Sequence, residues 1–131
     1  MKGIALALGA ALILSAPAAA SNWVHIGNGS AGTRVFVDTA SISGTFPLFR
    51  VWVQYIGGAN PPPMASEKDY MLLNCTARTT STISWITYRV NGTVIKSGTI
   101  PESIIGFQAE PAAPDTIADM ILTKACNGLA L

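Results

Sequence analysis

The chain is poor in the residues from which most catalytic and metal sites are built. Its 131 residues include one histidine and two cysteines, and charged residues make up only 11%. The eight basic and seven acidic side chains leave a formal net charge of +1 and form no cluster of one sign. Binding to nucleic acid or to an anionic membrane surface needs such a basic cluster. The sequence therefore predicts no nucleic-acid partner.

Catalytic combinations are equally scarce. His25 stands alone between Val24 and Ile26 in an expected strand, and no nucleophile, base and orienting group can be arranged around it. The chain has no Cys-x-x-Cys pair and no phosphate-binding glycine motif. We therefore predict no catalytic residue, no metal and no cofactor. A small envelope enzyme or enzyme inhibitor remains an alternative, because two carboxylates can meet in a fold without a sequence signature.

The N-terminal segment contains the only long apolar run. Lys2 is followed by apolar residues from Ile4 to Leu14 and by small residues that end at Ala20. This layout is typical of a secretory signal peptide, so we expect residues 1–20 to be removed and residues 21–131 to form a single domain. No cysteine lies near the expected cleavage site. We expect an exported protein, periplasmic or secreted, without a stable membrane anchor after cleavage.

The remaining sequence alternates β-rich runs with turn residues. The pattern predicts six mostly antiparallel strands, at residues 22–26, 33–38, 48–56, 70–78, 81–90 and 93–100. Asn91-Gly92 between two β-branched runs is a strong hairpin signal. The period changes after the last strand, where residues 111–128 favour a helix with Pro114 in its first turn. One face of this helix is apolar and consists of Ile117, Ala118, Ile121, Leu122 and Ala125.

The two cysteines predict how the helix meets the sheet. In an oxidising compartment Cys75 and Cys126 are expected to form a disulfide. A period of two places Cys75 on the same strand face as Met71 and Leu73, so the helix should cross that apolar face. The sequence therefore predicts an α+β fold: an antiparallel sheet of about six strands, with one C-terminal helix packed on one face and tied to it by the disulfide.

The opposite sheet face is the candidate binding surface. In the strand "LFRVWVQYI", Phe49, Val51 and Val53 alternate with the more polar set that includes Trp52. Trp, Tyr and Arg are enriched at binding hot spots, and an uncovered apolar patch usually has a function. The predicted binding residues are Arg34, Phe36, Arg50, Trp52, Tyr70 and Arg78. Two alternatives stay open: loops and long side chains cover the patch, or it forms a homodimer contact.

Several segments carry a family resemblance when they are taken in order. The segments "VFVD", "RVWVQY", "NCTAR", "YRVNGTVI" and "PDTIADMILTKAC" span most of the chain from Trp23 to Cys126. Together they resemble the surface-adhesin protein E family of Gram-negative bacteria. The resemblance implies a six-stranded antiparallel sheet with a disulfide-tied C-terminal helix, and adhesion to host extracellular-matrix proteins.

The leading hypothesis is thus an exported, non-enzymatic module that binds a protein, either a host extracellular-matrix protein or an envelope partner. A structural or homodimeric periplasmic protein without an external ligand is the second hypothesis. The expected lack of a lipid anchor departs from what display on the cell surface requires.

Overall fold

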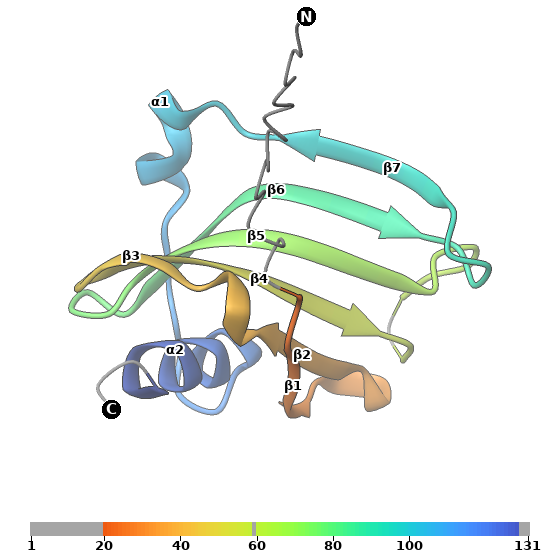
Figure 1. The fold of residues 1–131 in the computed structure, drawn as a ribbon, viewed down its shortest axis with the longest axis horizontal. Helices are drawn as coiled ribbons and strands as arrows, with labels where there is room; N and C mark the ends of the chain where they lie inside the picture. The colour runs from red at the N-terminus through yellow and green to blue at the C-terminus, as the bar shows by residue number, and fades with distance from the viewer. Residues whose placement is uncertain (1–19, 59, 129–131) are drawn as a thin grey trace, which may run out of the picture.

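The computed structural model describes residues 20–58 and 60–128, which form an antiparallel sheet with a helix against one face (Figure 1). Neighbouring strands follow the order β1-β2-β4-β5-β6-β7, while β3 pairs with β4 and β8 pairs with β6. The strands are β1 (Trp23–Asn28), β2 (Arg34–Asp38), β3 (Ser43–Thr45), β4 (Leu48–Ile56), β5 (Ser66–Asn74), β6 (Thr79–Tyr88), β7 (Val94–Thr99) and β8 (Glu110–Pro111). The α+β prediction is confirmed, and the six expected strands correspond to the main path. The short strands β3 and β8 were not predicted.

The C-terminal helix α2 (Ile117–Gly128) lies across the end of the sheet formed by β1, β2 and β4 (Figure 1). A short helix, α1 (Glu102–Ile105), and a 3-10 turn, η3 (Gly106–Gln108), connect β7 to β8. Two more 3-10 turns, η1 (Ser30–Gly32) and η2 (Thr39–Ser41), flank β2. No helix in the described part of the chain is long and apolar enough to cross a membrane.

The core lies between α2 and one face of the sheet. Alternate residues of β2, β4 and β5 meet the apolar face of α2, as the periods of two and 3.6 predict. Its buried members are Val35, Val37, Val51, Val53, Met71, Leu73, Ile121, Leu122 and Ala125. Full burial of one such side chain stabilises the fold by about 1.5–3 kcal/mol, so this interface is the main source of stability.

The predicted hairpin at Asn91-Gly92 is present between β6 and β7. Arg89 N–H donates to the Thr93 carbonyl at 2.9 Å, and the Asn91 side chain accepts from Thr93 N–H at 3.0 Å. Gly92 has a φ of +87°, a conformation that glycine adopts without steric cost.

The predicted boundaries of the central strand were wrong. We expected a strand over residues 70–78, but β5 runs from Ser66 to Asn74 because it pairs with β4 along its whole length. It stops there because the Asn74 side chain accepts hydrogen bonds from the N–H groups of Thr76 and Ala77, which makes a turn. Arg78, with a φ of +53°, closes that turn.

The predicted start of the helix was also wrong. We expected Pro114 in its first turn within residues 111–128, but α2 begins at Ile117, and Pro111 belongs to β8, where it pairs with Thr79. Asp115 adopts a φ of +63°, which no right-handed helix can contain. Thr116 Oγ1 then accepts a hydrogen bond from Asp119 N–H at 3.3 Å, which is the bond of a helix N-cap.

The disulfide between Cys75 and Cys126 is confirmed, with the two Cα atoms 5.8 Å apart. Cys75 lies in the turn immediately after β5 rather than within a strand. The bond still joins this end of β5 to α2 on the core side. It closes a loop of 51 residues along the chain.

We predict that replacing both cysteines with serine destabilises the protein by about 4 kcal/mol, because the unfolded chain regains the entropy of that loop. Urea unfolding of the oxidised protein and of the Cys75→Ser/Cys126→Ser variant measures the difference. Equal unfolding midpoints would show that core packing alone holds α2.

Candidate functional site

The sheet face opposite α2, called here the open face, carries an aromatic surface. Trp52 of β4 pairs with Tyr70 of β5, and their ring centroids are 5.0 Å apart. The 3-10 turn η2 positions the backbone of Trp52, because Ser41 Oγ accepts a hydrogen bond from the N–H of Trp52 at 2.9 Å. This bond occurs where β4 passes from pairing with β2 to pairing with β3. The other aromatic rings of the open face belong to Trp23, Phe36 and Tyr88.

A lysine lies among these rings. Lys68 Nζ is 5.4 Å from the ring centroid of Trp23 and 5.2 Å from that of Tyr88. Both contacts are cation–π interactions, in which the face of the ring attracts the positive charge. Within residues 20–58 and 60–128, no carboxylate oxygen lies within 4.0 Å of this amine. The charge of Lys68 therefore has no ion-pair partner in this part of the chain.

Five of the six predicted binding residues lie on the open face. The Arg34 guanidinium is 5.6 Å from the ring centroid of Phe36. Arg50 forms an ion pair with Glu102 of α1 at 3.4 Å, with both groups exposed. Such exposed pairs contribute little stability, so Arg50 is available to a ligand.

The sixth predicted residue, Arg78, lies elsewhere. Its position in the turn after β5 directs its guanidinium toward α2, where it pairs with Asp119. The pKa of Asp119 is lowered, first by a hydrogen bond from the Asp115 N–H and then by the hydrogen bond from the Arg78 guanidinium. The expectation that Arg78 shares a face with Tyr70 fails because the strand ends at Asn74, before the alternation reaches it.

Sequence reasoning missed Trp23, Lys68 and Tyr88 as members of the site. Lys68 lies just before the strand predicted at residues 70–78, although Ser66, Lys68 and Tyr70 alternate as strand residues do. The other two lie in strands that were predicted. What was missing was the cross-strand register, which brings both rings to the same amine.

The carboxylates of β5 lie on the other side of the sheet. Glu67 pairs with Tyr55 and Asp69 with the buried Val53, so both belong to the α2-facing side. Asp69 Oδ1 is buried without a hydrogen-bond partner. Burial, and then the charge and hydrogen bonding of Glu67, raise the pKa of Asp69 to about 7. Burial, followed by these two charges, also raises the pKa of Tyr55.

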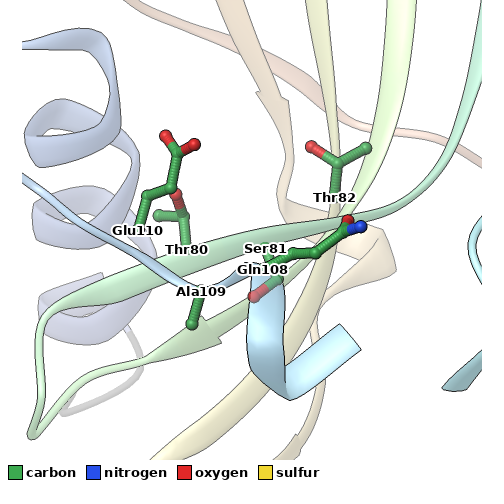
Figure 2. A pocket seen from close by; sticks show the side chains of 6 residues that line it. All are labelled: Thr80, Ser81, Thr82, Gln108, Ala109 and Glu110. Carbon is green, nitrogen blue, oxygen red and sulfur yellow. The ribbon is translucent and has the colours of Figure 1, made fainter. Parts of the chain in front are cut away.

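A separate polar hollow of about 370 Å³ opens at the edge of β6. β7 pairs with β6 from Ser84 onward and β8 pairs only at Thr79 and Thr80, which leaves a gap between the two. Figure 2 shows the hollow at this gap, with Glu110 and Thr80 side by side. Its lining is Thr80, Ser81, Thr82, Gln108, Ala109 and Glu110. A single carboxylate among hydroxyl and amide groups offers no acid–base pair.

His25 is exposed, its Nε2 lies 3.0 Å from Asn28 Oδ1, and its ring centroid is 5.1 Å from that of Phe36. In the described part of the chain, no three His, Cys, Asp or Glu side chains are grouped as metal ligands would be.

The fold and the site define a class of protein: a single antiparallel sheet with one face covered by a disulfide-tied helix and an aromatic surface on the other face. The chain belongs to the surface-adhesin protein E family, whose model matches residues 23–127. It is thus an adhesin-like surface protein, which confirms the resemblance seen in the sequence. A search of curated proteins gives no match.

Among solved structures, crystal form II of Haemophilus influenzae protein E is similar in fold. The two chains are 13% identical with a TM-score of 0.53, and the match covers 74% of this chain and 83% of that chain. At this identity the likeness concerns the fold alone.

The raised pKa of Asp69 predicts a pH dependence of stability. Asp69 holds its proton more tightly in the folded than in the unfolded state, so stability should fall as pH rises from about 4 to about 7. Asp69→Asn should remove this part of the slope and stabilise the protein above pH 7. Urea unfolding over this pH range tests the prediction, with Asp115→Asn as an exposed control. An unchanged slope in Asp69→Asn would contradict it.

Proposed function

We propose that this protein is an exported, non-enzymatic binding module that recognises a protein partner through the open face. The partner is a host extracellular-matrix protein or another envelope protein. The observation that carries the proposal is the Trp52–Tyr70 pair next to Lys68, an aromatic and cationic surface on the side of the sheet that α2 does not cover.

The composition of the open face supports binding over a purely structural role. Trp and Tyr provide large contact areas, and they dominate the energetics of protein interfaces. Trp52, Tyr70 and Lys68 are each half-buried in the isolated chain. Contacts with neighbouring residues therefore restrict these side chains, while part of each stays exposed to a partner. A pre-ordered surface loses less side-chain entropy when a partner binds.

Two features support export. Residues 1–20 fit a signal peptide, and structural disulfides such as Cys75–Cys126 are typical of oxidising compartments. The non-enzymatic assignment is supported by family membership and by the carboxylates: Glu67 and Asp69 belong to the α2-facing side, away from the open face.

We predict that Trp52→Ala weakens binding to a matrix-protein ligand by about tenfold or more, since truncating a hot-spot residue costs at least about 1.4 kcal/mol. Biolayer interferometry against a panel of purified extracellular-matrix proteins measures the effect. Phe46→Ala is the matched control, because Phe46 is 68% exposed in the β3–β4 connection, where it contacts Phe49 rather than the Trp52–Tyr70 pair.

Equal loss in the two variants, or no loss in Trp52→Ala, would contradict the proposal. A homodimer by light scattering that dissociates in Trp52→Ala would instead favour the structural alternative, in which this face is an interface between copies.

A further inference from the structure

Three hollows follow one another along β6 on the open face. The first, of about 290 Å³, shares Trp52 and Ile86 with the second, of about 240 Å³. The second shares Lys68 and Tyr88 with the third, of about 380 Å³. Because each shares two lining residues with the next, they lie side by side, and this row of three hollows is called here the β6 groove.

The spacing of the β6 groove matches an extended peptide. Ser84, Ile86 and Tyr88 project to the same face of β6 and mark the successive hollows. Residues two apart on a strand are about 7 Å apart. An extended peptide lying along β6 has the same repeat, so alternate side chains of such a peptide can enter successive hollows.

The two ends of the groove differ in charge. The first hollow contains no ionisable side chain, and the indole of Trp52 contributes to it. The third hollow contains Lys68 and Arg89. Arg89 donates to Thr93 Oγ1 at 3.3 Å and to the Val94 carbonyl at 3.2 Å, both of them neutral. In the described part of the chain neither cation has a carboxylate within 4.0 Å.

The nearby acidic groups either face the other side of the sheet or are buried and hydrogen-bonded to backbone N–H groups. Glu67 and Asp69 belong to the α2-facing side of β5. Asp38 lines the second hollow but is only 6% exposed, and its Oδ1 accepts from the N–H groups of Asn22 and Ala40. The groove is therefore positive at one end although the chain as a whole is nearly neutral.

We infer that the β6 groove binds an extended acidic segment of the partner protein, with an aromatic side chain in the hollow of Trp52 and carboxylates two and four residues away in the hollows of Lys68 and Arg89. Charge complementarity selects this ligand, because a carboxylate supplies the counter-charge that Lys68 and Arg89 lack within 4.0 Å in the described part of the chain. The inference rests on the proposed function and names the chemistry that the open face recognises.

Fluorescence anisotropy with short labelled peptides tests this inference. The probes are Phe-Ser-Asp-Ser-Asp and its reversed sequence, with blocked termini, together with the neutral peptide Phe-Ser-Asn-Ser-Asn. We expect one of the two acidic peptides, according to the chain direction in the groove, to bind about tenfold or more tightly than the neutral peptide. This preference should shrink at high salt, because salt screens charges at a solvated surface.

Variants of Lys68 test whether the preference for the acidic peptide arises in the β6 groove. Lys68→Met keeps the apolar stem between the two rings and should remove the preference for the acidic peptide, whereas Lys68→Arg should keep it. Lys96→Met is the matched control, because Lys96 pairs with Thr87 and so belongs to the face that carries Glu67. Circular dichroism checks that each variant is folded.

Equal binding of acidic and neutral peptides to the wild-type protein would overturn the inference, as would a preference that survives in Lys68→Met. Tighter, Lys68-dependent binding of an acidic oligosaccharide such as a hyaluronan fragment would assign the groove to a glycan instead. If matrix-protein binding still depends on Trp52 in these cases, the proposed function stands and only the acidic segment is refuted.

Discussion

The packing of α2 across one face of the sheet is the constraint on which the rest of the structure depends. A single sheet has two faces, and within residues 20–58 and 60–128 there is one long helix with which to cover them. Ile121, Leu122 and Ala125 bury the valines of β2 and β4, and the Cys75–Cys126 bond holds the helix at the end of β5. Once that face is closed, the side chains that alternate with the core must form the other surface.

The same alternation explains why an aromatic surface exists in so small a domain. Val51 and Val53 enter the core, so Trp52 between them must face away, beside Tyr70 on the next strand. The pairing of β5 with β4 and β6 places Lys68 and Tyr88 on the same face. The acidic neighbours of Lys68 in sequence, Glu67 and Asp69, lie on the opposite face. A nearly neutral chain thus presents a positive groove, which is the arrangement that steers association with acidic partners.

Much of this architecture could be predicted from sequence. The period of two in β4 and the apolar arc of α2 identified the residues that meet in the core, and the export signal with two cysteines indicated the disulfide. The boundaries were less predictable because local hydrogen bonds decide them. Asn74 ends β5 through its side chain, and the left-handed Asp115 delays the start of α2. Asn and Asp favour turns and caps but also occur inside strands and helices, so their types alone do not fix a boundary.

What the sequence determined by itself is which side each residue of a strand takes, because successive side chains point to opposite faces whatever the neighbouring strand. Only the tertiary structure decided which residues meet across strands. The register shifts after His25, Tyr70 and Thr87, and each shift moves later partners by one position. The contact of Lys68 with Trp23 and Tyr88 therefore depends on the alignment of five strands, β1, β2, β4, β5 and β6, since pairing between distant segments is set by the packing of the whole sheet.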